Sequence, residues 1–362
     1  MLCSIRSITV GKDLAPWRQD GETWMPRITL QHIFRYCNVI GIDRRQAEEN
    51  IREESMTHVF SHPAGLGHIT PPGHPERVER LAAVANGLAG LAIIRREAPL
   101  ADRAEVLRCH PARHLARIEA ALPQEGWAQL DADTFLSPGS LAAALQAIGG
   151  AGAAVDAVLV GEARNAFVAC RPPGHHAEAA TAMGFCLFGT VAIAAKRALD
   201  HHGLSRVAIV DFDVHHGNGT QDLIWDEARC FFASSHQMPL YPGSGAASET
   251  GAHGQIVNVP LREGSGGDVM RAAYEARILP ALAAWKPELI LISAGFDAHA
   301  DDPLAGLEWQ AEDYAWLTER ICDVADATCQ GRVVSCLEGG YDLPALTASV
   351  NAHVGVLQER GR

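Results

Sequence analysis

The sequence predicts an α/β fold, a single three-layer domain with a central, mainly parallel sheet. From Met56 onward, short strand-like apolar runs alternate with helical patterns, which is typical of doubly wound sheets. Four of these runs end in clusters of polar residues. Because ligands of open parallel sheets bind beyond the carboxyl ends of the strands, we expect the four clusters to meet at one edge.

The strand-like runs and the helical patterns follow one another along the chain. Strands are expected at Thr57–Phe60, Asn165–Cys170, Arg206–Val210, Arg229–Ser234, Gln255–Leu261, Glu288–Ser293 and Arg332–Leu337. Helices are expected at Glu76–Leu88, Gly139–Leu159, Thr190–Asp200, Asp268–Trp285 and Glu312–Thr328. Ser137-Pro138 and Gly267-Asp268 supply helix starts, and Lys286-Pro287 supplies a stop.

The first 55 residues differ from the rest, because they lack the alternation of strands and helices. Two interpretations are open: residues 1–55 are a genuine N-terminal extension, or the coding start is placed too far upstream and Met56 is the true first residue. We favour the second, and the intact mass of natively expressed protein distinguishes them. Residues 56–362 are expected to form the domain.

The composition describes an ordinary globular chain of 362 residues, with 48% hydrophobic and 20% charged residues. Its net charge of −13 disfavours direct binding of nucleic acid and favours cationic substrates through long-range steering. The apolar stretch Leu141–Val160 contains Gln146 and Asp156, so we interpret it as a buried helix and not as a membrane span. We recognise no signal peptide.

The nine cysteines form no CxxC pair and no regular framework. Cys170, Cys230 and Cys336 lie in strand-like runs, where a free cysteine behaves as a small hydrophobic residue. This usage is typical of a reducing compartment, so a cytoplasmic location is expected.

The segment Asp211-Phe-Asp213-Val-His215 follows a buried strand and carries metal-ligand chemistry. On a strand the side-chain period is two, so these three polar residues are expected to face one way. Asp297 follows another strand. Asp213, His215 and Asp297 would give three ligands and an open position, as in catalytic zinc sites. The alternative is a hydrogen-bonded polar cluster without metal.

Two further strand ends supply groups for proton transfer and oxyanion binding. His175 and His176 follow the rigid turn Arg171-Pro-Pro-Gly174 and offer two imidazoles to act as base and acid. The pair His201-His202, at a predicted helix end, lacks such a frame and is expected to be inert. Tyr341 follows Gly339-Gly340, which let the backbone approach a ligand, and its phenol can stabilise an oxyanion.

Four motifs, in this order, resemble signatures of the zinc-dependent histone deacetylase family, which includes acetylpolyamine amidohydrolases. They are Arg171-Pro-Pro-Gly-His-His176, Asp211-Phe-Asp-Val-His-His-Gly-Asn-Gly-Thr220, Ser293-Ala-Gly-Phe-Asp297 and Leu337-Glu-Gly-Gly-Tyr341. The resemblance runs from Met56 to about Val354 and implies the arginase-deacetylase fold. Asn218 is similar to the pattern of class II and bacterial members.

The resemblance also implies roles for individual residues. Asp213, His215 and Asp297 would hold one Zn²⁺. His176 would act as general base and then acid, beside His175, which would be oriented by Asp211.

Tyr341 would donate to the oxyanion. Gly184, Phe185, Gly339, Gly340 and Arg80 would form the acyl-binding tunnel and the cavity behind it. A K⁺ ion near Asp211 and Ser234 is a less direct transfer.

Parts of the tunnel wall depart from the family pattern. The loop after His236 lacks the paired Phe common in the family, and Met238, Leu240 or Tyr241 would fill that wall. Asp131 or Asp133 would anchor the substrate backbone.

The sequence therefore predicts a zinc-dependent hydrolase of linear amides that removes acetyl or short acyl groups by metal-activated attack of water. An acetylated lysine side chain and an acetylated polyamine remain equally good substrates, and the oligomeric state stays open. Two alternatives are a two-metal ureohydrolase, usually with manganese, and a non-catalytic acyl-lysine binding protein.

Overall fold

The computed structural model describes residues 56–362, so the interpretation of residues 1–55 lies outside the described residues. An eight-stranded sheet forms the centre of this part of the chain, and each neighbouring pair of its strands is parallel. Its strands, in spatial order, are β2 (Ile94–Glu97), β1 (Thr57–Ser61), β5 (Asn165–Val168), β10 (Val333–Leu337), β9 (Leu289–Ala294), β6 (Val207–Asp211), β7 (Cys230–Gln237) and β8 (Ile256–Leu261).

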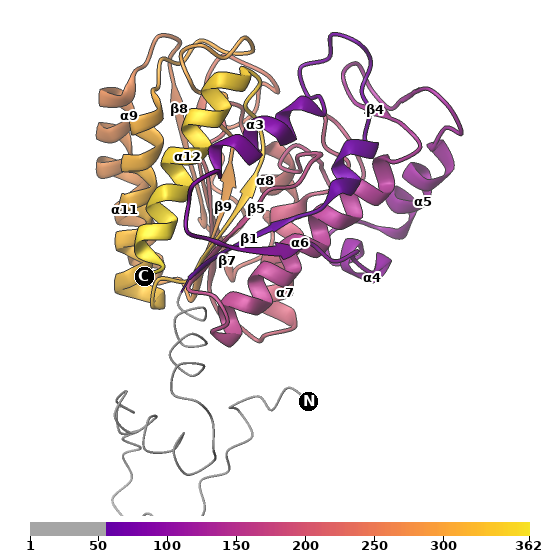
Figure 1. Cartoon of the computed structure of the whole chain (residues 1–362). Helices are drawn as coiled ribbons and strands as arrows, with labels where there is room; N and C mark the ends of the chain where they lie inside the picture. The colour runs from indigo at the N-terminus through magenta and orange to yellow at the C-terminus, as the bar shows by residue number, and fades with distance from the viewer. Residues whose placement is uncertain (1–55) are drawn as a thin grey trace, which may run out of the picture. The chain divides into compact units, whose positions relative to one another are not determined.

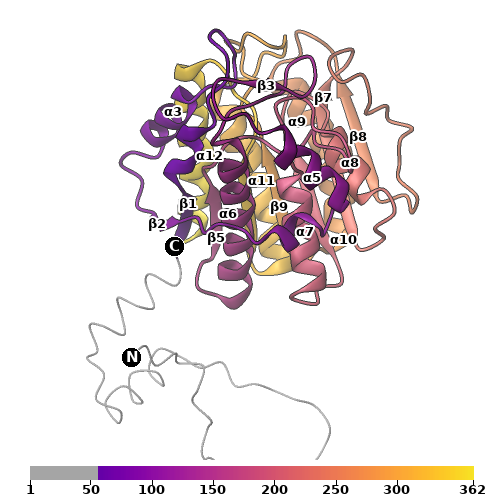
Figure 2. The same ribbon diagram turned by 90° about the vertical axis from the view of Figure 1, so that its right-hand side faces the viewer.

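Helices cover both faces of the sheet, as the predicted three-layer architecture requires (Figure 1). One layer consists of α3 (Glu79–Gly87), α9 (Gly267–Ala273), α10 (Leu279–Trp285), α11 (Ala311–Cys329) and α12 (Leu343–Arg360). The other consists of α6 (Ser140–Val160), α7 (Thr190–Asp200) and α8 (Asn218–Ile224). Figure 2 shows α6 and α7 in front of the sheet. The central strands are buried on both faces, which explains their continuous apolar runs.

Smaller elements complete the fold beside α6. They are the 3₁₀ turn η2 (Pro63–Gly67), α4 (Arg103–Val106), α5 (Ala112–Ala121), and a two-stranded antiparallel ribbon of β3 (Ala128–Gln129) and β4 (Phe135–Leu136). Their apolar side chains form a third core cluster with α6. The sequence analysis did not identify α4, α5, α8 or α12, and it missed β2 and the ribbon.

The single helix predicted over Asp268–Trp285 was wrong in detail. The segment starts as α9, passes through the π-helical turn η3 (Tyr274–Ile278) and continues as α10. Pro280 lies in the first turn of α10. Proline has no amide hydrogen and clashes with the carbonyl four residues earlier, so a regular α-helix cannot pass through it.

The helix α6 is long and apolar enough to cross a membrane by length and composition. In this structure 72% of its most apolar window is buried inside the fold. It packs against α7 and the strand layer through small side chains such as Ala151 and Ala154, which are fully buried. The prediction of a buried helix at this position agrees with its packing.

The four strands that precede the polar clusters are neighbours at the centre of the sheet, in the order β5-β10-β9-β6. Because they run parallel, their carboxyl ends lie at one edge. This contiguity is the feature of the fold that positions the site.

Candidate active site

The loops after β6 and β9 bring together two carboxylates and an imidazole. His215 Nδ1 lies 3.1 Å from Asp213 Oδ1 and 3.1 Å from Asp297 Oδ2. One ligand atom from each of the three residues lies within 4.8 Å of the other two, and all three residues are buried. The structure thus places the three predicted metal ligands next to one another.

Asp211 does not belong to this group of three, although Asp211 and Asp213 both lie against the His175 ring. The strand β6 ends at Asp211, and the next residues form bends, so the side-chain period of two does not continue. Asp211 Oδ2 lies 3.1 Å from Nδ1 of His175. Its other oxygen accepts a hydrogen bond from the amide of Asp213.

The chemistry of the three residues fits a divalent cation. Burial and the neighbouring Asp213 carboxylate raise the pKa of Asp297. Burial alone would lower the pKa of His215, but its hydrogen bonds with Asp213 and Asp297 raise it to about 10. The group therefore attracts positive charge. Two carboxylates and one imidazole are suitable ligands for zinc and leave a fourth position open.

Two glycines allow these carboxylates to lie so close to the backbone. A Cβ atom on Gly295 would lie 2.0 Å from Asp213 Oδ2, and one on Gly339 would lie 2.1 Å from Asp297 Oδ2. The amide of Gly339 also donates to Asp213 Oδ2 at 2.9 Å. Gly339 was predicted to bind substrate, and in the structure it contacts the carboxylates of Asp213 and Asp297, two of the predicted metal ligands.

The substitution Gly339→Ala is expected to weaken zinc binding by about tenfold or more, because the new methyl group displaces the Asp297 carboxylate. Titration of the metal-free protein with zinc measures this. The matched control is Gly355→Ala in α12, where nothing lies within 4 Å of the added Cβ. The control is expected to keep its zinc affinity and to gain up to about 1 kcal/mol of stability. Equal affinities in the two variants would contradict this prediction.

His175 and His176 are held in contrasting environments. His175 Nδ1 lies beside the Asp211 carboxylate. Burial opposes its protonation, but Asp213 and Asp211 raise its pKa well above the ordinary value. His176 Nδ1 lies 2.7 Å from the Oδ1 atom of Asn218. Burial, with His175 and His215 nearby, lowers the pKa of His176 well below its ordinary value. His176 is therefore the neutral member of the pair.

A cavity of about 240 Å³ leads to this group of residues. It is lined by Asp133, His176, Gly184, Phe185, His215, Leu240, Tyr241, Leu304 and Tyr341. Gly184 has a φ of +54°, and a Cβ there would lie 2.4 Å from His176 Cδ2. Phe185 also has a positive φ, of 68°, which is strained for an aromatic residue.

The residues that line the cavity decide between alternatives that the sequence left open. Leu240 and Tyr241 line the cavity, and the Tyr241 ring packs edge-on against His176 at 5.1 Å. Met238 is not among the lining residues within the described range. Asp133 lines the cavity, whereas Asp131 accepts hydrogen bonds from the amides that follow it.

Tyr341 lines the cavity and is held in place by Phe185, Arg80 and Asp302. Its ring contacts Phe185 at 5.8 Å, and the Arg80 guanidinium lies 5.0 Å from its ring centroid. Arg80 Nε donates to the carbonyl of Gly340 at 2.7 Å. The amide of Tyr341 donates to Asp302 Oδ2 at 2.7 Å. Within residues 56–362, Arg80, Gly339 and Gly340 do not line the cavity, so they support it from behind.

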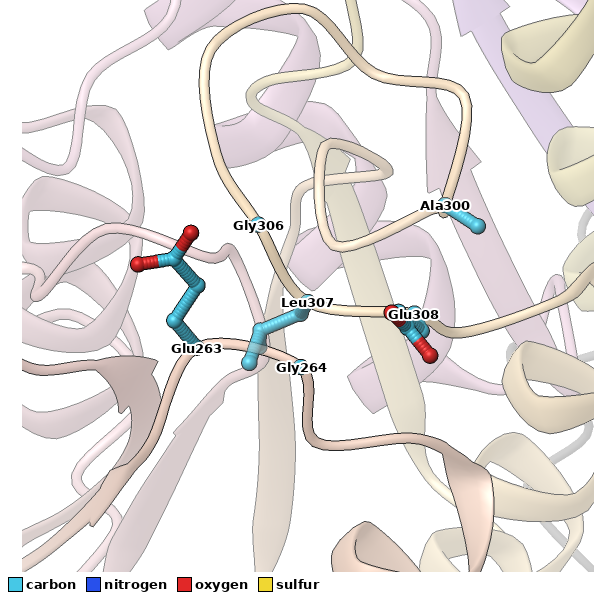
Figure 3. Close-up of a pocket in the computed structure, with 6 residues that line it drawn as sticks. All are labelled: Glu263, Gly264, Ala300, Gly306, Leu307 and Glu308. Atoms are coloured by element: carbon cyan, nitrogen blue, oxygen red, sulfur yellow. The ribbon is translucent and has the colours of Figure 1, made fainter.

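A second, shallower hollow of about 530 Å³ lies between two loops (Figure 3). It is lined by Glu263, Gly264, Ala300, Gly306, Leu307 and Glu308. The carboxylates of Glu263 and Glu308 extend in different directions. The hollow lacks convergent polar groups, so we assign no chemistry to it.

Comparison with known proteins agrees with this geometry. The histone deacetylase domain pattern matches residues 74–357. The histone deacetylase-like amidohydrolase of Pseudomonas aeruginosa is 41% identical over 283 residues, covering 77% of this chain and 74% of that protein. The chain belongs to the histone deacetylase family.

Other members of the histone deacetylase family support the same assignment. A probable deacetylase of Archaeoglobus fulgidus is 39% identical over 297 residues, covering 80% of this chain and 82% of that protein. The crystal structure of the HDA15 HD domain superposes with a TM-score of 0.79 at 34% identity, covering 84% of this chain and 89% of that one. The family and the fold predicted from the sequence are thus confirmed, and membership supports deacetylase activity.

Three buried or half-buried carboxylates of this deacetylase-family site were missed by the sequence analysis. Glu76 binds both Arg80 and Arg171, Asp302 holds the backbone of Tyr341, and Glu178 contacts Asn218. Burial and the Asp297 carboxylate raise the pKa of Asp302 to about 7. Glu76 and Arg80 have the i,i+4 spacing of neighbours on a helix, which could have indicated their pairing. Asp302 and Glu178 show no periodic pattern with the residues they support, because both act from loops or turns.

Proposed function

We propose that this protein is a zinc-dependent amidohydrolase that removes acetyl or short acyl groups from N-acylated amines. The arrangement that carries the proposal is one cavity lined by both His176 and Tyr341, with Asp213, His215 and Asp297 grouped beside them. His215 belongs both to that group and to the cavity wall. An acyl group entering the cavity therefore reaches the metal ligands, the base and the phenol together.

Different residues of the chain would carry out the separate steps of hydrolysis. Asp213, His215 and Asp297 would hold zinc, which supplies a Lewis acid that lowers the pKa of water and polarises the amide carbonyl. Asn218 engages His176 Nδ1, which leaves Nε2 free to take a proton from the attacking water and return it to the leaving amine. Tyr341 donates a hydrogen bond to the developing oxyanion.

Tyr341→Phe is expected to lower kcat by about 10²- to 10³-fold, the typical effect of removing one oxyanion donor. The ring and its contacts with Phe185 and Arg80 remain, so the fold and the zinc content should not change. Steady-state kinetics on an acetyl-lysine peptide measure the effect. The control is Tyr274→Phe, which loses one hydrogen bond to Ser235 in the core and should retain turnover within about twofold. Near-normal kcat in Tyr341→Phe would remove the assigned role.

A substrate panel tests the proposal as a whole. Zinc-loaded protein is mixed with acetyl-lysine peptides, acetylputrescine, acetylspermidine and longer acyl-lysines, and release of the acid is measured. The proposal expects turnover of at least one of these classes and one zinc per chain. Two manganese ions per chain would favour a ureohydrolase, and binding without product release would favour an acyl-lysine reader.

The net charge of −13 suits both lysine tails and polyamines, so it does not decide between the two substrate classes.

The K⁺ ion beside Asp211 and Ser234 remains a prediction. These residues are register partners in neighbouring strands, and the hydroxyl of Ser234 hydrogen-bonds His236. A cytoplasmic location and the absence of direct nucleic-acid binding also remain predictions.

A further inference from the structure

A half-buried carboxylate outside the predicted site is linked to His176 through an amide. Oε1 of Glu178 accepts a hydrogen bond from Asn218 Nδ2 at 2.9 Å. Oδ1 of Asn218 lies 2.7 Å from His176 Nδ1. The second hydrogen of the Asn218 amide points to Met183 Sδ at 3.4 Å. Every polar atom of the Asn218 side chain therefore has a partner.

The chemistry of these partners allows only one orientation of the Asn218 amide. An ionised carboxylate accepts hydrogen bonds and donates none, and a thioether sulfur is also only an acceptor. Glu178 and Met183 therefore both require the NH₂ group of Asn218 to face them. The flipped amide would direct its oxygen at a carboxylate oxygen and at sulfur, without any hydrogen between them. Oδ1 must consequently face His176.

The orientation of the amide in turn selects the tautomer of His176. A carbonyl oxygen can only accept, so the ring must carry its hydrogen on Nδ1 and donate it to Asn218. The neutral ring then has its lone pair on Nε2. No residue within 56–362 hydrogen-bonds this Nε2, and His176 lines the cavity. The lone pair is thus available where a base is required.

The backbone holds both ends of this connection in place. Glu178 and Thr181 exchange backbone hydrogen bonds in a short antiparallel bridge. Asn218 is the first residue of α8, and the amide of Thr220 donates to the carbonyl of His175 at 3.0 Å. A Cβ on Gly219 would lie 2.4 Å from the Ala177 carbonyl, which shows how closely the two segments approach. The segments of the carboxylate and of the amide therefore pack directly together.

We propose that Glu178 is a positioning residue that fixes the base-competent tautomer of His176 by orienting the amide of Asn218. The role in turnover rests on the proposed deacetylase function, whereas the tautomer can be measured without it. The neighbouring His175 meets its carboxylate, Asp211, directly. At His176 the carboxylate of Glu178 does not contact the ring itself. It contacts the Asn218 amide, which fixes the hydrogen-bond direction at His176 Nδ1 without placing a negative charge beside the ring.

The experiment exchanges the carboxylate and the amide between positions 178 and 218, first one position at a time and then both together. In Glu178→Gln, the new side chain can present either oxygen or NH₂ to Asn218, so the amide and the tautomer are no longer fixed. We expect kcat to fall by about tenfold with KM nearly unchanged.

In Asn218→Asp, two carboxylates face each other, and kcat should fall as well. In the double variant, the new amide at position 178 donates to the new carboxylate at position 218, which accepts from His176 Nδ1. Its kcat should recover to within about threefold of the parent.

The direction in which Glu178→Gln changes kcat distinguishes a positioning role of Glu178 from a purely structural role. Glu178→Gln should be harmful in the parent and beneficial in the Asn218→Asp background. A loss by the same factor in both backgrounds, or no loss in the parent, would overturn the proposal. The control Asp222→Asn weakens another carboxylate contact to the same loop, the hydrogen bond from the amide of Ala179, and does not touch Asn218. It should retain kcat within about twofold.

Nitrogen NMR of ¹⁵N-histidine-labelled, zinc-loaded protein reads the tautomer directly, with the His176 signals assigned by their loss in His176→Ala. The parent and the double variant should carry the hydrogen on Nδ1, and Glu178→Gln should show a mixture of both tautomers. A parent ring protonated on Nε2, or identical spectra for the parent and Glu178→Gln, would overturn the proposal. If the parent turned over no acetylated amine while its spectra behaved as expected, the proposed function would fail and the positioning role would stand.

Discussion

Asp297→Asn is expected to abolish zinc uptake at micromolar metal and to lower turnover by about 10³-fold or more. The substitution removes one of the two negative charges that face His215, while the amide oxygen can still accept from Val214. The fold should therefore persist although the metal affinity is lost. The turnover estimate follows because the metal contributes several kcal/mol of transition-state stabilisation.

Two measurements independent of activity test the change at Asp297. Metal analysis after dialysis should give one zinc per chain for the parent and almost none for the variant. Adding zinc should raise the unfolding temperature of the metal-free parent, because a ligand that binds only the folded state stabilises it, and the variant should show no such rise. Asp326→Asn serves as the control, since this carboxylate pairs with Arg164 and Arg360 at the surface. A variant with full zinc content would remove Asp297 from the site.

The meeting of the four polar clusters at one edge could be predicted because it requires only that the four strands run parallel in one sheet. Each cluster follows a buried parallel strand, and parallel strands present their carboxyl ends at one edge. The structure adds that β5, β10, β9 and β6 are adjacent, which makes the convergence close enough for shared contacts. The sequence could not show this order, because the order depends on how the crossover helices pack.

The side-chain direction at Asp211 could not be predicted in the same way. The period-two rule holds only while the backbone stays extended, and β6 ends at Asp211 itself. Asp213 and His215 therefore group with Asp297, and Asp213 Oδ2 also lies 3.7 Å from His175 Nε2, whereas Asp211 contacts Nδ1 of the same ring. The bends that follow Asp211 are enough to give Asp211 and Asp213 different hydrogen-bond partners.

The residues that hold the site from outside, such as Asp302 and Glu178, could not be predicted from the sequence for a different reason. Asp302 and Glu178 bind through loops that are close in space and distant or irregular in sequence. Phe185 adopts a positive φ, a conformation that residue type alone argues against. Such positions are determined by tertiary contacts, and strained backbone of this kind is concentrated at functional sites.

His176→Ala is expected to lower kcat by about 10²- to 10⁴-fold, the range for loss of a positioned general base and acid. No residue within 56–362 hydrogen-bonds its Nε2 at the cavity, and burial, with His175 and His215 nearby, lowers the pKa of the ring, so the ring is neutral and its Nε2 lone pair faces the cavity. Because the ring is not one of the three proposed metal ligands, zinc content should remain at one per chain. Kinetics and metal analysis on the same preparation measure both.

The matched control for this loss is His201→Ala, which removes one imidazole from the other tandem histidine pair, at the end of α7. That variant should retain kcat within about twofold. Glu178→Gln should lie between the two, since it leaves the base in place and releases only its orientation. If His176→Ala retained near-normal kcat while Tyr341→Phe did not, His176 would lose its assigned role as proton acceptor.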